Sequence, residues 1–397
     1  MQRIGIYGGT FNPPHVGHVR AAEYARQALE LDRLLMVPTN ISPHKALAAD
    51  SPTPGQRLEM VRLAVQSVPG VEVSDIELQR EGPSYTWQTV NQLRQENPDT
   101  QLFLLMGTDM FLSFHRWKEP QRIMAEATLA VFYRGETGEI EAVEQQKQAL
   151  EARGNKVVLV KNPVLEISST QLRRMLVLRC ASEFLPKTVE SYIYEKGFYG
   201  TSRCLKQLPM EQLEAVVMSL LKPGRVAHVL GCRQTAAELA RHWGADETNA
   251  QRAALLHDIT KAFDGPLQLT LSRSYGMILD DFSCRNAKTL HALTGSWVAR
   301  EIFGENDAVV SAIASHTTGK PGMGLLEKII YVADYMEPNR DFIGVEELRR
   351  LAFTDIDAAL KLGLNMTITL LRQQGREVSP ESAQTLAWLQ REERKIL

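Results

Sequence analysis

The chain has 397 residues, a length that exceeds one ordinary hydrophobic core and predicts two domains of roughly 200 residues each. Its 44% hydrophobic and 23% charged residues are typical of a globular protein. The formal net charge of −2 provides no field that would attract nucleic acid or an anionic membrane, and no apolar run reaches the roughly 18 residues that cross a bilayer. We therefore expect neither nucleic acid nor a membrane as a partner.

The chain's four cysteines stand far apart and form no CxxC pair: Cys180, Cys204, Cys232 and Cys284. This spacing favours neither a disulfide scaffold nor a thiolate zinc site. The first residues, Met1–Tyr7, have the pattern of a strand that enters a glycine turn, and not that of a secretory leader. A reducing cytoplasm is therefore the expected location.

In the first half of the chain, up to about residue 165, short apolar runs alternate with helical patterns such as Pro54–Val68 and Trp87–Glu96. The alternation predicts an α/β doubly wound parallel sheet with helices on both faces. Ligands of such a sheet bind beyond the carboxyl ends of its strands. The predicted strands are Arg3–Tyr7, Leu34–Val37, Val71–Val73, Leu102–Met106, Leu129–Tyr133 and Val157–Val160.

After about residue 205 the strand pattern ends, and apolar residues recur at helical spacing, which predicts an all-α second domain. We expect domains at 1–200 and 210–397, joined by a linker at 201–209 that is rich in turn formers. The predicted helices are Met210–Leu221, Val226–His242, Asn249–His257, Asn286–Phe303, Asp307–Ser315 and Leu325–Met336.

The first candidate site follows the first predicted strand, where Gly8–His18 reads GGTFNPPHVGH. A strand, a glycine turn and a helix start place free backbone amides and the helix dipole where an anion can bind. Gly8 and Gly9 allow phosphates to approach the main chain closely. The segment matches neither a Walker loop nor GxGxxG, but His15 and His18 at a helix start suit a polyphosphate leaving group.

The segment Gly8–His18 resembles the nucleotidyltransferase signature of bacterial nicotinate mononucleotide adenylyltransferases. The resemblance implies a Rossmann-like HxGH fold that transfers AMP from ATP to nicotinate mononucleotide, giving deamido-NAD and pyrophosphate, with Mg²⁺ arriving on ATP. It covers nearly all of residues 1–200 and continues in family order through Ser42–Lys45, Ser84–Thr86, Met106–Asp109, Phe114–Trp117 and Ile167–Arg173.

The same resemblance implies a role for individual residues. Trp117 would stack on the pyridine ring, Tyr85 and Thr86 would offer amides to its carboxylate, and Asp109 would hold a ribose hydroxyl. The implied catalytic residues are His15, His18, His44 and Lys45. The implied ATP-binding residues are Gly8, Gly9, Thr10, Phe11, Ser168, Ser169, Thr170 and Arg173. The implied mononucleotide-binding residues are Tyr85, Thr86, Gly107, Asp109, Trp117 and Arg134.

Pantetheine-phosphate adenylyltransferases and cytidylyltransferases share the HxGH core and are the closest competing interpretations. The segments Asn12–Pro14 and Ser42–Lys45, together with Trp117, point away from both. Whether the amide form of the mononucleotide is also accepted stays open.

The second candidate site is a set of histidines and aspartates in the order H…HD…H…H…D. One such histidine is more often a core or surface residue, and His242 beside Trp243 is read in that way. The complete set contains only nitrogen and oxygen ligands, which favour iron, manganese or magnesium over structural zinc. Four of its members suffice for one metal, and the third and fourth histidines provide for a second. The set is His228, His257, Asp258, His291, His316 and Asp334.

The surrounding segments resemble YqeK-like HD-domain hydrolases over roughly 210–380. The resemblance implies symmetrical hydrolysis of diadenosine tetraphosphate to two ADP at two divalent or trivalent metals, iron or manganese. It also makes Lys261, Thr317 and Arg340 candidate contacts to the nucleotide. The segments are Arg225–His228, Ala254–Lys261, His291–Ala292, His316–Met323 and Leu326–Arg340.

Two other interpretations of the helical half stay open. It is either a nucleotide-sensing module that binds metal without turnover, or a phosphohydrolase on another nucleotide such as an alarmone or a cyclic dinucleotide. The intact ligand set argues against the first, and the absence of a GYP segment from the sequence argues against cyclic dinucleotides. The oligomeric state cannot be predicted from the sequence.

Overall fold

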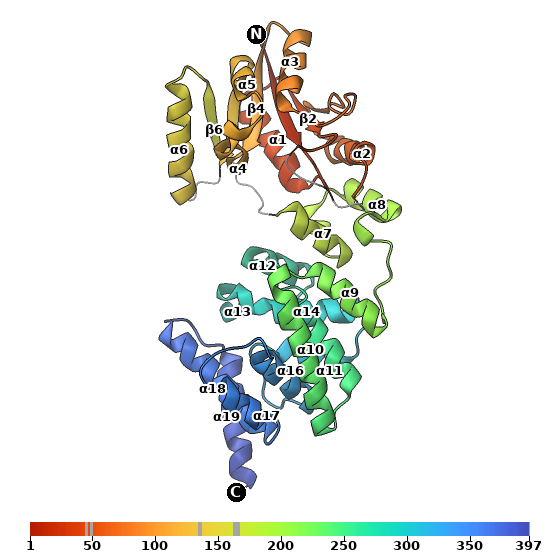
Figure 1. The fold of residues 1–397 in the computed structure, drawn as a ribbon, viewed down its shortest axis with the longest axis vertical. Coiled ribbons are helices and arrows are strands. Elements are labelled where there is room, and N and C mark those ends of the chain that lie inside the picture. Colours follow the sequence, from red (N-terminus) through yellow and green to blue (C-terminus); the bar gives the residue numbers. More distant parts are fainter. Residues whose placement is uncertain (44–46, 48–50, 134–136, 162–166, 397) are drawn as a thin grey trace. The chain divides into compact units, whose positions relative to one another are not determined.

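The computed structural model describes residues 1–43, 47, 51–133, 137–161 and 167–396 (Figure 1). The chain divides into two compact units, Met1–Arg203 and Cys204–Leu397. Each unit has its own core and is described by itself.

The described part of the first unit contains one parallel sheet with the strand order β3-β2-β1-β4-β5-β6. Each strand coincides with an apolar run of the sequence, so the predicted doubly wound fold is confirmed. The chain moves outward from β1 in one direction and then crosses to β4 on its other side, so the strand order reverses between β1 and β4. The strands are β1 (Gln2–Gly9), β2 (Arg33–Pro38), β3 (Val71–Val73), β4 (Thr100–Gly107), β5 (Ala127–Tyr133) and β6 (Val157–Lys161).

Helices cover both faces of this sheet because its strands are apolar on both sides. Ile4 and Ile6 of β1 point to one face and join a buried cluster with residues of α3, α4, α5 and α6. The opposite side is packed against α1 and α2, which contact β2 and β3. The helices are α1 (Val16–Ala28), α2 (Pro54–Val65), α3 (Thr86–Glu96), α4 (Thr108–Leu112), α5 (Pro120–Glu126), α6 (Thr137–Glu151), α7 (Ser169–Val177) and α8 (Lys187–Lys196), with short 3-10 turns at Phe114–Arg116, Ser182–Phe184 and Phe198–Gly200.

A buried arginine on α2 fixes the loops that follow β1 and β2. The Arg57 side chain is 1% exposed and donates to the carbonyl oxygens of Thr10 and Thr39 at 2.7 Å each, and of Asn40 at 3.0 Å. Buried carbonyls need donors, and one guanidinium supplies them for two separate loops. Arg57 therefore connects the packing of α2 to the shape of the sheet's ligand-binding edge.

The second unit is all-helical over its described residues, which confirms the predicted all-α second domain. Helix α10 packs against α11 and α16, and α15 packs against α14, α11 and α16. The helices are α9 (Met210–Leu220), α10 (Pro223–Trp243), α11 (Glu247–Leu256), α12 (Gly265–Ser274), α13 (Asp281–Arg285), α14 (His291–Glu301), α15 (Asp307–Ser315), α16 (Leu325–Met336), α17 (Val345–Ala352), α18 (Ile356–Gln373) and α19 (Pro380–Ile396).

One predicted helix differs in detail from the structure. The stretch Asn286–Phe303 divides into a 3-10 turn at Ala287–Leu290 and α14, so His291 opens a helix instead of lying within one. Its Nδ1 donates to the Lys288 carbonyl at 2.6 Å, three residues earlier, which suits the tighter turn. None of the helices formed by described residues is long and apolar enough to cross a membrane.

Replacing Arg57 by leucine should destabilise the first unit. Three partly buried carbonyls would lose their donor, and we expect the free energy of unfolding to fall by on the order of 3 kcal/mol. Amide hydrogen exchange of β1 and β4 in the full chain measures this loss. Arg62→Leu on the same helix is the matched control, because its side chain is 53% exposed. Equal effects of the two substitutions would contradict the role of Arg57.

Candidate active sites

The first candidate site lies at the carboxyl end of β1, where the chain turns into α1. His15 has an extended backbone and caps α1, so it stands at the positive end of the helix dipole. A Cβ added at Gly8 would meet no described atom within 4 Å, whereas one at Gly9 would lie 2.9 Å from the Phe11 ring. Space is therefore open above Gly8, as a phosphate cradle requires, while Gly9 accommodates Phe11.

The His15 and His18 rings lie against each other, with centroids 3.6 Å apart and planes tilted by 34°. The His15 backbone N–H donates to Nδ1 of His18 at 3.2 Å, so the neutral His18 ring carries its proton on Nε2. Nδ1 of His15 is buried and has no hydrogen-bond partner in the described part of the chain. The pair therefore has hydrogen-bonding capacity left for a ligand.

Burial keeps both rings neutral. Desolvation lowers the pKa of His15 to about 4. The pKa of His18 is lowered well below its usual value, first by desolvation and second by the neighbouring His15. Near neutral pH the two rings therefore donate hydrogen bonds and add no formal charge to the site.

The start of α7 lies against the same loop. Ser168 caps α7, and its Oγ accepts from the Gln171 backbone at 3.2 Å. Arg173 donates to the Asn12 carbonyl at 2.9 Å and to Thr170 Oγ1 at 3.1 Å. Arg173 thus connects the first turn of α7 to the loop after β1, bringing together two groups of predicted ATP-binding residues that are far apart in sequence.

The predicted mononucleotide residues stand on other elements of the same unit. Tyr85 caps α3 and Thr86 begins it, so backbone amides are available there. Gly107 ends β4 and Asp109 lies exposed in the first turn of α4, at the point where the strand order reverses beside β1. Trp117 is half-buried and packs against Phe114, with ring centroids 5.2 Å apart.

Some predicted residues are described only in part or not at all. His44, Lys45 and Arg134 lie outside the described residues. The Phe11 side chain is 3% exposed and packs edge-on against Tyr7 and His18, so only its backbone faces the open loop. The Thr10 carbonyl is already bound by Arg57.

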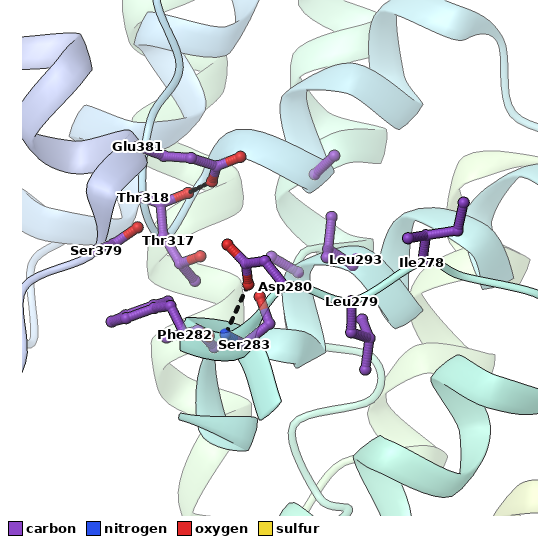
Figure 2. Close-up of a pocket in the computed structure, with 13 residues that line it drawn as sticks. Ile278, Leu279, Asp280, Phe282, Ser283, Leu293, Thr317, Thr318, Ser379 and Glu381 are labelled. Carbon is purple, nitrogen blue, oxygen red and sulfur yellow. Dashed lines mark hydrogen bonds between the residues drawn. The ribbon is translucent and has the colours of Figure 1, made fainter. Parts of the chain in front are cut away.

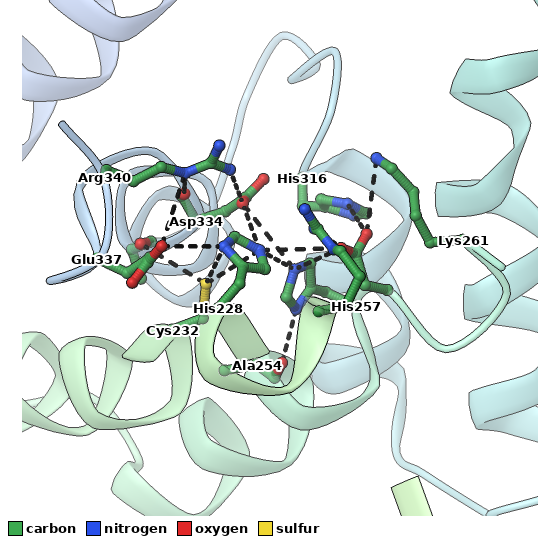
Figure 3. Close-up of polar contacts among 12 residues, drawn as sticks. His228, Cys232, Ala254, His257, Lys261, His316, Asp334, Glu337 and Arg340 are labelled. Carbon is green, nitrogen blue, oxygen red and sulfur yellow. Dashed lines mark hydrogen bonds and ion pairs between the residues drawn. The ribbon is translucent and has the colours of Figure 1, made fainter. Parts of the chain in front are cut away.

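In the second unit, the six predicted metal ligands converge on one centre, and all but Asp334 are buried. Figure 3 labels four of them, His228, His257, His316 and Asp334. His228 lies on α10, and Asp334 lies on α16 with Oδ1 3.1 Å from His228 Nε2. His257 and His316 directly follow α11 and α15, whereas His291 begins α14. Helix ends, and not helix faces alone, therefore aim these rings.

The imidazoles of this centre are oriented by hydrogen bonds on their Nδ1 atoms. His257, His291 and His316 each bond a backbone carbonyl three residues earlier, at 2.6 Å in every case. Because a carbonyl only accepts, Nδ1 carries the proton and Nε2 presents a bare lone pair. Nε2 of His291 lies 3.2 Å from Nε2 of His316, and Nε2 of His228 lies 3.3 Å from that of His257.

This arrangement fits metal binding. Lone pairs that face each other at such distances repel, and a cation between them removes the repulsion. Burial lowers the pKa of His291 and His316 to about 3, so protons do not take that place at neutral pH. Although burial favours its neutral form, the pKa of Asp334 is held well below the usual value by the neighbouring His228 and His257 side chains.

Asp258 joins two groups of ligands. Its Oδ2 lies 3.5 Å from His257 Nε2 and 3.8 Å from His228 Nε2. Its Oδ1 lies 3.3 Å from His291 Nε2 and 3.9 Å from His316 Nε2, and accepts no hydrogen bond from any residue that the structure describes. One carboxylate thus faces two sets of nitrogen donors, as a bridge between two metals would.

Three cationic side chains surround the carboxylates. Lys261 Nζ lies 3.7 Å from Asp258 Oδ1 and 2.9 Å from His291 Nε2, and its side chain is 41% exposed. Desolvation lowers the pKa of Lys261 to about 8, so it is still mainly protonated at pH 7. Arg225 pairs with Asp258, and Arg340 donates to Asp334 Oδ1 at 2.8 Å. The predicted residues Lys261 and Arg340 are therefore part of the centre.

Thr317 lines a pocket beside the centre (Figure 2). Two of the residues that line this pocket come shortly after metal-site histidines in the sequence. Thr317 follows His316, and Leu293 on another wall comes two residues after His291. The lining combines apolar groups with the carboxylates of Asp280 and Glu381 and contains no lysine or arginine. It therefore suits an uncharged group better than a phosphate.

Comparisons with known proteins agree with the geometry of the first site. A family model described as Cytidylyltransferase-like matches residues 6–175. A "Probable nicotinate-nucleotide adenylyltransferase" from Desulfatibacillum aliphaticivorans is 36% identical over 217 residues, and one from Dictyoglomus thermophilum is 38% identical over 198 residues. Each match spans 99% of that protein and 50% of this chain. The chain belongs to the nicotinate-nucleotide adenylyltransferase family.

The second half of the chain matches a different family. A family model described as HD domain matches residues 225–339, a range that contains all six candidate metal ligands. A solved structure entitled "predicted HD superfamily hydrolase involved in NAD metabolism", from Clostridium acetobutylicum, is 36% identical. The match covers 46% of this chain and 97% of that one, with a TM-score of 0.45. An adenylyltransferase unit is thus followed by an HD domain.

Three residues of the HD centre were not among the predicted site residues. Arg225 stands one helical turn before His228, and Cys232 one turn after it, with Sγ 3.5 Å from His228 Nε2. Their spacing on a single helix was a signal that could have found both. Glu337 accepts from His228 Nδ1 at 3.1 Å across 109 positions of sequence, and no local pattern indicates that contact.

The neutral state of His15 gives a pH prediction for the adenylyltransferase unit. Its pKa is about 4 when folded and 6.5 in the reference state, so the unfolded chain binds the proton first and stability is lost as the pH falls from about 6.5 towards 4. We expect the stability of the wild type relative to His15→Asn to fall by roughly 2 kcal/mol between pH 6.5 and pH 5.

Urea denaturation of the full chain at the two pH values measures this difference. His115→Asn is the control, because the His115 ring is exposed. A constant difference between wild type and His15→Asn would show that His15 is not a buried neutral ring.

Proposed function

We propose that the first unit transfers AMP from ATP to nicotinate mononucleotide and releases pyrophosphate. The observation that carries this proposal is the His15–His18 pair at the start of α1, beside the point where the strand order reverses between β1 and β4. Doubly wound sheets bind nucleotides at such a reversal. The names of the relatives supply the substrate pair.

In the proposed reaction, a phosphate oxygen of the mononucleotide attacks the α-phosphorus of ATP, and the bond to the bridging oxygen of pyrophosphate breaks. This reaction needs alignment and charge stabilisation more than a covalent protein intermediate. His15 and His18 donate hydrogen bonds to the triphosphate, and the α7 start with Ser169, Thr170 and Arg173 holds its outer phosphates. Magnesium bound to ATP supplies the remaining positive charge, because the two histidines are neutral.

Substrate selection is assigned to residues along the same sheet edge. Amides at Tyr85 and Thr86 would bind the pyridine carboxylate, and Asp109 would bind a ribose hydroxyl. The exposed part of Trp117 would stack on the pyridine ring. His44 and Lys45 keep their implied catalytic roles, and Arg134 its implied role in binding the mononucleotide, on the sequence resemblance alone.

A pyrophosphate-release assay with ATP and nicotinate mononucleotide tests this proposal. We expect turnover with this substrate and none with phosphopantetheine. His18→Ala should lower kcat/KM by on the order of 100-fold, because it removes a donor to developing charge. His115→Ala should retain activity. Turnover with phosphopantetheine alone would refute the assignment.

We propose that the HD domain is a dinuclear phosphohydrolase that cleaves diadenosine tetraphosphate symmetrically into two ADP. The observation that carries this proposal is the position of Asp258, with one carboxylate oxygen towards each pair of imidazoles. The nitrogen and oxygen donors favour iron or manganese. When bound, the two metals supply an activated water and neutralise charge on the attacked phosphate.

The surrounding cations support a polyphosphate substrate. Lys261 is partly exposed and lies within 4 Å of Asp258, while Arg225 and Arg340 pair with the two ligand carboxylates. Positive side chains at the rim of an anionic ligand set suit a substrate that carries several negative charges. Water adds to an inner phosphorus, the central P–O–P bridge breaks, and each half leaves as ADP.

The pocket that contains Thr317 is the proposed place for one nucleoside of this substrate. Its apolar side chains would contact the base, and Asp280 or Glu381 would accept hydrogen bonds from ribose hydroxyls or from an amino group. Its lack of lysine and arginine assigns the phosphates to the neighbouring cationic centre.

Product analysis with manganese or iron added to the full chain tests the second proposal. We expect diadenosine tetraphosphate to give ADP only, and Asp258→Asn to lower the rate by at least on the order of 100-fold because it removes the bridging charge. His242→Asn is the control, because His242 is exposed and packs against Trp243 away from the ligand set. Products of ATP and AMP would refute symmetrical cleavage. Binding without any product would favour the sensing module.

A further inference from the structure

One of the four metal-site histidines differs from the others in what holds its Nδ1 atom. His257, His291 and His316 each bond a neutral backbone carbonyl. Nδ1 of His228 instead lies 3.1 Å from Oε1 of Glu337, a carboxylate that is 1% exposed. A charged acceptor makes an imidazole a stronger ligand and fixes its proton more firmly than a carbonyl does.

Glu337 is itself held in a single position. Its Oε2 accepts from the backbone N–H of Asn339 at 2.7 Å and from the Asn339 side-chain amide at 2.8 Å. Figure 3 shows the contact of Glu337 with His228. With Oε1 on His228 and Oε2 on Asn339, both carboxylate oxygens are occupied. The position follows the end of α16, the helix that also carries the ligand Asp334.

Gly231 provides the space that this carboxylate occupies. A Cβ at position 231 would lie 2.4 Å from Glu337 Oε2 and 3.1 Å from Asn339 Nδ2. Gly231 lies inside α10, where alanine would be the better helix former. The glycine is therefore explained by the close approach of Glu337, which is a second observation for the same contact.

We propose that Glu337 is a positioning residue that prepares His228 for the metal ion shared with His257 and Asp334. The proposal rests on the dinuclear centre proposed above. It adds that the two metal positions are unequal. The His228 side has a carboxylate behind one ligand, whereas His291 and His316 have only carbonyls behind them. Loss of the Glu337 charge should therefore weaken one metal position selectively.

Glutamine at position 337 would keep the volume but reverse one hydrogen bond. If its carbonyl oxygen accepts from the two Asn339 donors, its NH₂ group must donate to His228 Nδ1. That arrangement moves the His228 proton to Nε2 and blocks the ligand atom. The opposite rotamer would place the NH₂ group against two donors of Asn339, which is the worse alternative.

The test is metal content of the full chain after loading with Mn²⁺ and removal of free metal. We expect about two ions per chain for the wild type and about one for Glu337→Gln, since loss of such an outer partner lowers metal affinity by roughly 10- to 100-fold. Electron paramagnetic resonance should show coupled ions in the wild type and a single uncoupled ion in Glu337→Gln. A misfolded chain would not give one ordered ion.

Two further variants make the result specific. Gly231→Ala keeps Glu337 but displaces it, and should also leave about one ion. Glu305→Gln is the matched control, because Glu305 is a buried carboxylate whose partner is Arg252, at 2.6 Å. It should keep two ions even if it lowers stability.

The outcomes separate this inference from the proposed function. Two coupled ions in both Glu337→Gln and Gly231→Ala would overturn the positioning role and leave the dinuclear centre intact. A wild type without bound metal would overturn the centre itself and the positioning role with it. One ion in Glu305→Gln as well would show that any buried carboxylate has this effect, which also overturns the proposal.

Discussion

The HD domain depends on one electrostatic constraint: four imidazoles are buried together with their Nε2 lone pairs turned inward. Each ring is fixed by an acceptor on its Nδ1, so none can turn its proton to the centre without losing that bond. Nε2 lone pairs arranged in this way repel one another unless a cation lies between them. Helix ends and helix faces from five segments, α10, α11, α14, α15 and α16, meet to build this one arrangement.

The candidate site of the adenylyltransferase unit is built from different groups. Its two histidines are neutral donors next to the start of α1, and Arg173 ties the start of α7 to the same loop. The site is therefore built from hydrogen-bond donors and helix dipoles at the edge of a sheet, with Arg57 buried behind it to fix the loops. The HD centre relies on carboxylates, imidazoles and a rim of cations. The two units thus present different chemical groups to a ligand.

Much of the fold was predictable because its signals are local. Each strand of the sheet is a short apolar run, and β2, β4 and β5 are buried along nearly their whole length, so these runs alone located β1 to β6. The order of the strands was not predictable, because nothing in the run Leu102–Met106 indicates that this strand pairs with β1 and not with β3. The predicted helix ends differ from the observed ones where a histidine directly follows a helix or begins one, as His257 and His291 do.

The six candidate metal ligands were predictable from their order and residue types, and the structure places their side chains near one another. The contacts that hold these side chains in place were not predictable from the sequence. The acceptor for His228 is 109 positions away, and its presence depends on the turn after α16 and on the absence of a side chain at Gly231. Such contacts are set by tertiary packing, whereas Arg225 and Cys232 lie one turn from His228 on α10 and follow from helix geometry.

The most direct measurement of the central claim is anomalous X-ray diffraction from crystals of the full chain loaded with manganese. The account predicts two anomalous peaks about 3.5–4 Å apart, with Asp258 between them, His228, His257 and Asp334 at one, and His291 and His316 at the other. A single peak, or metal bound away from these side chains, would contradict it.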